Sequence, residues 1–168
     1  MDASTCRKLA SQLPWSAFHG DWAAYKEALY IVFKRDFIES KPIFNGRQVD
    51  IIHQQTHEGK ERSFWHIISQ GQDDSVRDLD SDRCENLPRV RSLIEDDGSC
   101  SNYRLWVKWH DHTKRDRYYI WCMSINYIVI LEDRGNHFKL ITAYNVMPYK
   151  VKDYNKEYAK YIKTKTPT

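Results

Sequence analysis

One histidine of the chain lies in a strongly apolar stretch. His66 sits in the run SFWHIIS, between Trp65 and Ile67, whereas the other histidines lie in polar or turn-like contexts. Burial beside large apolar side chains would restrain the imidazole ring and move its pKa from the ordinary value of about 6.5. His66 is therefore a candidate for acid–base catalysis, and a purely structural core histidine is an equal alternative.

Two hydroxyl residues near the C-terminal end raise a related question. Thr142 and Tyr144 are two residues apart in GNHFKLITAYNV (135–146), so in a strand both project from one face. Phe138 and Leu140 would share that face, and the other face also carries apolar residues. The spacing does not say which face is the core, and Tyr144 has a plain alternative as an aromatic cross-strand partner.

The third group of candidates is cationic. Arginine offers a fixed fork for phosphate oxygens, and threonine and tyrosine hydroxyls can hold the same group. Metal-free RNA cleavage needs a base for the 2′-hydroxyl proton, an acid for the 5′-oxygen and cations around the phosphorus. Arg117 and Arg134 can also be ordinary charges at hairpin ends. The candidate substrate-binding residues are Arg83, Arg89, Arg117, Arg134 and Lys150, with Arg91 as a catalytic candidate.

Other chemistries lack their motifs. The chain has no Gly-rich phosphate loop, no G-x-S-x-G elbow and no C-x-x-C pair. His53 and His57 are four apart but lack the glutamate of a metalloprotease motif, and His110 and His112 read as a polar hairpin end. We therefore expect no metal and no cofactor.

The four cysteines, Cys6, Cys84, Cys100 and Cys122, are scattered along the chain. The N-terminus lacks the apolar run of a signal peptide, and no segment approaches the roughly 18 apolar residues of a membrane span. These features predict a cytoplasmic protein with free thiols and no membrane contact.

The charge is unevenly spread. The net charge is only +3, but residues 150–168 carry six lysines against one aspartate and one glutamate. A local positive field can attract polyanions. A solvated, partly frayed terminal helix explains the same residues equally well.

The elements that must position these residues fit one domain over 1–168. Residues 1–40 read as helical, and Asp21 is a candidate cap for an apolar helical face that extends to about Phe37. Residues 41–149 read as a sheet with one inserted helix over 80–96, which Pro88 would begin or kink. Residues 150–168 form a basic terminal helix or tail.

The sheet is the clearest part of the pattern. The runs YRLWVKWH, RYYIWCM, NYIVILED and NHFKLITAYNV are joined by turns too short for a parallel crossover, so they predict an antiparallel meander. Asn45-Gly46 predicts a tight hairpin, HQQTHEGKE a loop, and FWHII a further extended segment. The expected fold class is α+β, with N-terminal helices packed on a twisted antiparallel sheet of four to five strands and a C-terminal basic helix.

The order of these motifs resembles the phage and prophage proteins of the barnase–EndoU–colicin–RelE-like nuclease superfamily. The resemblance rests on LYIVFKRDFIESKPIFNGRQV, GKERSFWHIISQG, DSDRCENLPRVRSLIE and the final strands, and spans roughly residues 29–158. It implies an RNase-type fold whose open sheet face holds the active site. It places the motif histidine at His66, the arginine after the RC pair at Arg91, and the hydroxyl positions at Thr142 and Tyr144.

The function expected from these residues and this resemblance is a metal-independent endoribonuclease of the phage or toxin type. RNA would be its partner, with a cognate antitoxin or immunity protein. One alternative is a noncatalytic RNA-binding or phage interaction module of the same fold. A partner-bound structural or immunity-type protein without RNA affinity is another.

Overall fold

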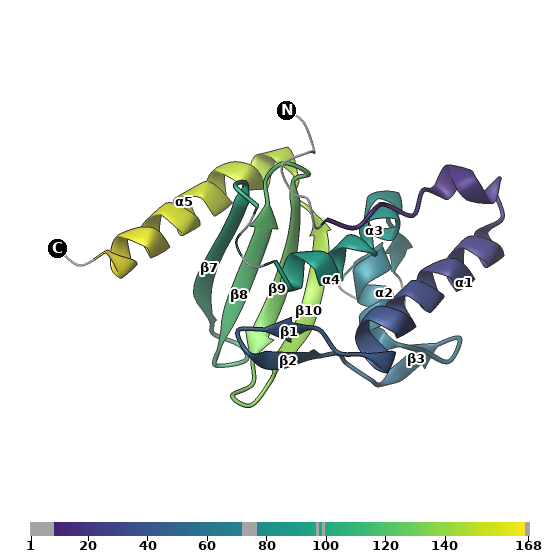
Figure 1. The fold of residues 1–168 in the computed structure, drawn as a ribbon, viewed down its shortest axis with the longest axis horizontal. Coiled ribbons are helices and arrows are strands. Elements are labelled where there is room, and N and C mark those ends of the chain that lie inside the picture. Colours follow the sequence, from purple (N-terminus) through teal and green to yellow (C-terminus); the bar gives the residue numbers. More distant parts are fainter. Residues whose placement is uncertain (1–8, 72–76, 97, 99, 167–168) are drawn as a thin grey trace.

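A computed structural model describes residues 9–71, 77–96, 98 and 100–166 of the chain. Its centre is a curled six-stranded sheet in the order β1-β2-β10-β9-β8-β7 (Figure 1). All neighbouring strands are antiparallel except β2 and β10, which are parallel. The strands are β1 (Ile43–Phe44), β2 (Arg47–Asp50), β7 (Tyr103–His110), β8 (Arg115–Cys122), β9 (Tyr127–Asp133) and β10 (Phe138–Asn145).

The α+β class is confirmed, whereas the prediction of four to five antiparallel strands is wrong in detail. The meander of β7 to β10 follows the four runs with short turns that the sequence indicates. The Asn45-Gly46 hairpin also forms, with positive φ angles of 47° and 74° at its two turn residues. The missed feature is the parallel pairing of β2 with β10, which the long connection between the two strands permits.

The N-terminal part is helical only in places. A short 3-10 helix, η2 (Trp15–Phe18), precedes α1 (Trp22–Phe33), which continues as a π-helix, η3 (Lys34–Glu39). Asp21 caps α1 as predicted, because its carboxylate accepts a hydrogen bond from the backbone N–H of Ala24 at 3.0 Å.

The run that contains His66 is a helix instead of the predicted strand. It forms α2 (Arg62–Ile68), and the preceding stretch predicted as loop forms a small hairpin of β3 (Gln55–His57) and β4 (Lys60–Glu61). A second small pair, β5 (Ser69–Gln70) and β6 (Asp78–Leu79), follows α2. Short apolar runs fit a buried helix as well as a strand, which explains the error.

The helix predicted over 80–96 is two helices, α3 (Ser81–Asn86) and α4 (Arg89–Ile94). Leu87 and Pro88 separate them. Proline lacks an N–H for the helical ladder and clashes with the preceding turn, so the break falls where the sequence places Pro88.

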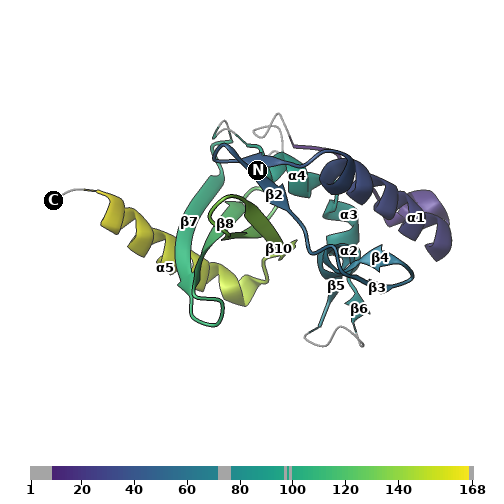
Figure 2. The ribbon, with the colours of Figure 1, turned by 90° about the horizontal axis from the view of Figure 1, so that it is seen from below.

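The two faces of the sheet pack against different partners. One face joins α1, α2, α3 and α4 in the main core, and the other packs against α5 (Pro148–Lys165), so α4 and α5 lie on opposite sides of the sheet (Figure 2). Tyr154, Tyr158 and Tyr161 of α5 lie on that second face, as their helical spacing predicts.

The cysteines differ from the expectation of free thiols. Cys84 and Cys122 are buried thiols, but Cys100 is in a disulfide, and Cys6 lies outside the described residues. Disulfides are uncommon in reducing compartments, so a cytoplasmic location stays a prediction. In the described part of the chain, no helix has the length and apolar character needed to cross a membrane.

Candidate functional site

A cavity of about 490 Å³ lies beside α2, and we refer to it as the α2 pocket. Two imidazoles, two indoles and three cationic side chains line it together with one carboxylate. The residues that define it are Trp22, Lys26, Thr56, His57, Glu58, Arg62, Trp65, His66, Ser69, Arg77 and Leu79.

The helical form of α2 explains why His66 faces this pocket. Arg62, Trp65, His66 and Ser69 follow the spacing i, i+3, i+4 and i+7, which places them on one side of the helix. The other side carries the core residues Phe64, Ile67 and Ile68. In the predicted strand, His66 would have shared a face with Phe64 and Ile68, whereas the helix separates it from both.

His57 is a pocket residue that sequence analysis set aside. It ends β3, and its backbone carbonyl accepts a hydrogen bond from the indole N–H of Trp65 at 3.1 Å. The His57 and Trp65 rings also meet edge to face, with centroids 5.3 Å apart. Trp65 therefore holds the β3–β4 hairpin against α2 and brings the second imidazole to the pocket that His66 lines. This hairpin has no local signal in the sequence.

The cationic side chains of the pocket are partly restrained. Arg77 donates to the Ser69 hydroxyl, the Ser69 carbonyl and the Gly71 carbonyl at 2.8 to 2.9 Å. Lys26 forms an ion pair with the pocket's one carboxylate, Glu58. Among the lining residues that the structure describes, three cations against one carboxylate leave a positive balance, which suits an anionic ligand.

Arg83 joins α2 to β10. Its Nη1 donates to the carbonyls of His66 and Ser69 at 3.2 and 2.8 Å, and its guanidinium lies 5.3 Å from the centre of the Tyr144 ring. Burial lowers the pKa of Arg83, and the nearby charge of Asp80 opposes that shift. Arginine nevertheless stays protonated at neutral pH. The guanidinium of Arg83 thus contacts two other predicted site residues, the backbone carbonyl of His66 and the ring of Tyr144.

A bulge in β10 decides which face Thr142 takes. The register with β9 shifts between Leu140 and Thr142, which leaves Ile141 as the extra residue. Phe138 and Leu140 therefore point into the main core, whereas Thr142, opposite Ile130, lies on the α5 face. The expectation that all the alternate residues of β10 share one face is wrong, because the bulge reverses the alternation.

Tyr144 is already engaged by α5. Its hydroxyl and that of Tyr154 are hydrogen-bonded to each other, and Tyr144 packs in the core cluster beneath α5. Burial raises the pKa of Tyr144, and the Tyr154 hydrogen bond opposes that rise. The α5 face is thus covered at Tyr144, so packing accounts for this residue.

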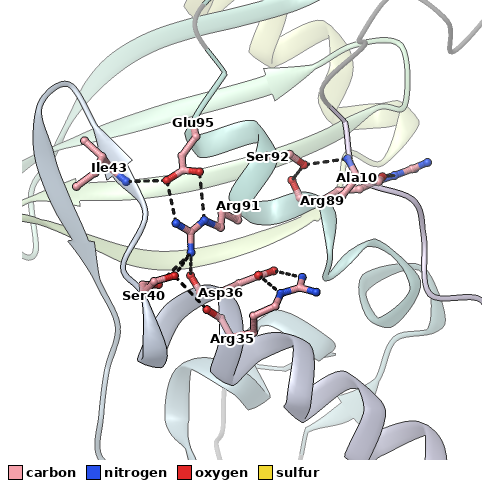
Figure 3. A network of polar contacts seen from close by, with 9 residues as sticks. All are labelled: Ala10, Arg35, Asp36, Ser40, Ile43, Arg89, Arg91, Ser92 and Glu95. Atoms are coloured by element: carbon pink, nitrogen blue, oxygen red, sulfur yellow. Dashed lines mark hydrogen bonds and ion pairs between the residues drawn. The ribbon is translucent and has the colours of Figure 1, made fainter.

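Arg91 and Arg89 lie in structural networks outside the lining of the α2 pocket (Figure 3). Arg91 pairs with Glu95 and donates to the carbonyls of Asp36 and Ser40 and to the Ser40 hydroxyl, at 2.7 to 3.1 Å. It thereby fastens α4 to the end of η3. Arg89 donates to the Ala10 carbonyl and the Asn86 side chain, which fastens the N-terminal segment.

Arg117 and Arg134 meet at a carboxylate that sequence analysis missed. Glu132 is fully buried, and its side chain lies 3.0 Å from Nε of Arg117 and 2.7 Å from a terminal nitrogen of Arg134. The Thr113 hydroxyl donates to Glu132 at 2.8 Å. Burial alone would raise the pKa of Glu132, but the hydrogen bonds from Thr113 and Arg117 and the charge of Arg134 outweigh it and hold the pKa below its ordinary value.

His110 extends this network to the β7–β8 turn. Its Nδ1 lies 3.0 Å from the Thr113 hydroxyl, which donates its own hydrogen to Glu132. The Thr113 backbone N–H donates to the same Nδ1 at 3.4 Å. Burial and then the charge of Arg117 lower the pKa of His110, which favours the neutral ring. Lys150, the remaining predicted ligand, is exposed in the first turn of α5.

No protein-family model, curated protein or solved structure matches this chain. Over the described ranges, no group of three or more His, Cys, Asp and Glu side chains could hold a metal ion.

Proposed function

We propose that this chain is a metal-independent endoribonuclease whose reaction centre is the α2 pocket. The observation that carries the proposal is the pair of imidazoles, His57 and His66, in one cavity with three cationic side chains. The reaction needs one group to take the proton from the 2′-hydroxyl and another to give a proton to the 5′-oxygen. Histidine suits both tasks because it exchanges protons near pH 7.

The proposed reaction is transfer of the phosphoryl group to the neighbouring 2′-oxygen. One imidazole takes the 2′-hydroxyl proton while the 2′-oxygen forms a bond to phosphorus. The bond from phosphorus to the 5′-oxygen breaks, and the other imidazole, protonated, gives that oxygen its proton. The products are a 2′,3′-cyclic phosphate and a free 5′-hydroxyl.

The other lining residues suit such a substrate. Lys26, Arg62 and Arg77 supply positive charge for the phosphorane, which carries more negative charge than the diester. Trp22 and Trp65 offer indole rings for stacking of unpaired bases, an interaction of about 1 to 3 kcal/mol per base. Arg83 acts indirectly in this proposal, because it bonds to the carbonyl of His66 in α2 and to that of Ser69 just after it, and so fixes the end of the helix that carries His66.

The test is cleavage of an oligoribonucleotide in EDTA by wild type, His57→Ala, His66→Ala and the control His112→Ala. His112 is exposed at the β7–β8 turn, outside the pocket. We expect each pocket variant to lose roughly 100- to 10,000-fold in rate and His112→Ala to keep the wild-type rate. Thermal melting establishes that each variant is folded, and 2′,3′-cyclic ends on the fragments identify the reaction.

Two results would contradict the proposal. Wild type that binds RNA but leaves it intact would favour the noncatalytic RNA-binding module. Fragments made equally by wild type and both folded pocket variants would place the chemistry elsewhere. RNA is thus the proposed partner, and a cognate antitoxin or immunity protein stays a prediction.

A further inference from the structure

A row of charged side chains crosses the sheet on the α5 face. Lys108 pairs with Arg117 between β7 and β8, Arg117 pairs with Glu132 between β8 and β9, and Glu132 pairs with Lys139 between β9 and β10. Directly opposed residues project from the same face, so these four side chains are neighbours. We call them the charged row.

The row is held together by its one carboxylate. Glu132 is fully buried although the groups around it are charged, because Arg117, Arg134 and Thr113 contact its oxygens. Arg117 makes this contact through Nε at 3.0 Å. A buried anion that binds two guanidinium groups fixes their positions before any ligand arrives.

The adjoining helix covers only the neighbouring part of this face. Glu157 of α5 accepts from the Trp106 indole at 3.2 Å and from Lys108 at 2.6 Å. Lys108 is therefore neutralised by α5. Arg117 and Arg134 keep side-chain exposures of 18% and 32%, and Lys139 is partly buried.

The remaining balance of charge is positive. Arg117, Arg134 and Lys139 are three cations around Glu132. Asp50 of β2, which is opposite Lys139, adds a second carboxylate but pairs with Lys41, so these six side chains carry a local charge of +2. His110 adds no positive charge at neutral pH, because its pKa is lowered. Two oriented forks and an ammonium group match the oxygens of a phosphate group.

We propose that Arg117, Arg134 and Lys139 form a second phosphate-binding site that holds the backbone of RNA outside the α2 pocket. The choice of RNA as the source of the phosphate rests on the proposed function. In this arrangement Glu132 is a positioning residue for the two guanidinium groups. The site would raise affinity for RNA of any sequence, because backbone contacts carry no base information.

The experiment compares two double variants that each remove two positive charges. Arg134→Gln with Lys139→Gln acts on the proposed site and leaves the Arg117–Glu132 pair intact. Lys34→Gln with Arg35→Gln is the matched control on η3. The probe is a 2′-O-methyl oligoribonucleotide, whose blocked 2′-oxygen prevents cleavage, and the readout is Kd at several salt concentrations.

We expect the site variant to raise Kd roughly 25-fold at 0.1 M salt and to reduce the slope of log Kd against log salt by about 1.4, for two lost phosphate contacts to a single strand. The control should keep the wild-type Kd and slope. Equal losses in both variants would show general electrostatic attraction and overturn the site, as would no loss in either.

A titration with inorganic phosphate separates the two sources of the ligand. If RNA is the ligand, millimolar phosphate competes weakly with the oligonucleotide in wild type. The RNA assignment would be overturned if inorganic phosphate saturated the site in wild type while the site variant bound the oligonucleotide as wild type does.

Failure of this site and failure of the proposed function give different results. If the His57 and His66 variants cleave normally while the site variant loses affinity, the phosphate site stands and the pocket chemistry fails. If the pocket variants lose cleavage while the site variant binds and cuts with an unchanged KM, the pocket stands and this inference fails.

Discussion

In the α2 pocket the charged side chains face a cavity, whereas in the charged row they face one another. Glu58 of the pocket is 39% exposed, but Glu132 of the row has no exposed surface. The pocket is assembled from α1, α2 and two small hairpins, and the row from the regular register of four strands. Charges that line a cavity are available to a reaction, while charges that neutralise each other mainly fix geometry.

The largest expected effect concerns the two carboxylates. Glu132→Gln leaves two guanidinium groups without their anion, so we expect a loss of about 3 kcal/mol in the free energy of unfolding. We take the lower end of the usual range for a broken buried ion pair, because the side chains that cover Glu132 are polar and lie near the surface. Glu58→Gln should cost less than about 1 kcal/mol, since that ion pair is partly solvated. Urea unfolding of both variants checks the contrast, and equal losses would break it.

The network around Arg91 allows a test of whether a partly buried arginine of this protein takes part in cleavage or only in stability. Arg91→Ala removes hydrogen bonds to Glu95, Ser40 and the Asp36 carbonyl, so we expect a loss of about 2 kcal/mol in stability. Cleavage by the folded variant should be unchanged. Lys156→Ala is the control, because Lys156 is exposed on α5. A large fall in kcat with normal stability would return Arg91 to the reaction.

The pKa values of Glu132 and Glu58 are both lowered, and acid should cost more stability at the buried Glu132 than at the partly exposed Glu58. The pKa of Glu132 is lowered on folding, so it contributes stability that is present above the unfolded value of about 4.5 and is lost as the pH falls through the folded value. We expect the unfolding free energy of wild type to decrease from pH 5 to pH 3. Glu132→Gln should flatten this dependence, whereas Glu58→Gln should follow wild type more closely. Parallel curves for the wild type and Glu132→Gln would contradict the assignment.

The smallest effect is expected at Tyr144, which lies between the two regions. Tyr144→Phe removes one hydrogen bond with Tyr154 and keeps the packing of the ring, so we expect a loss of about 1 kcal/mol in stability. Cleavage and RNA affinity should stay at wild-type values. Tyr154→Phe should cost about the same, because it removes the same bond. A folded Tyr144→Phe protein with strongly reduced cleavage would instead support the substrate contact that the sequence suggested.

Local patterns explain which parts of the fold were predictable. The alternation in β7 to β10 and the short turns between them are local signals, as is the Asp21 cap of α1. The parallel pairing of β2 with β10 joins distant segments and leaves no local signal. α2 was mistaken for a strand because FWHII is apolar throughout, and its helical pattern appears only when Arg62 and Ser69 are included.

The candidate site was predictable only through single residues. His66 stood out because of its apolar neighbours, but His57 reaches the pocket through a hairpin that the sequence did not indicate. Glu132 resembled the polar end of an apolar strand, and its burial depends on Arg117 and Arg134 closing over it. Thr142 could be placed on a face only once the bulge at Ile141 was known.

The pairing of β2 with β10 also bears on synthesis of the chain. Phe138 lies beside Val49, 89 residues later in the sequence, so the ribosome needs roughly 5 to 20 seconds to make the intervening segment. Until then the β1–β2 hairpin exposes an edge without its neighbour. Unpaired edges promote association between chains. We therefore expect nascent chains that stop before β10 to depend on chaperones. The β1–β2 hairpin should reach its final pairing only after β10 has been synthesised.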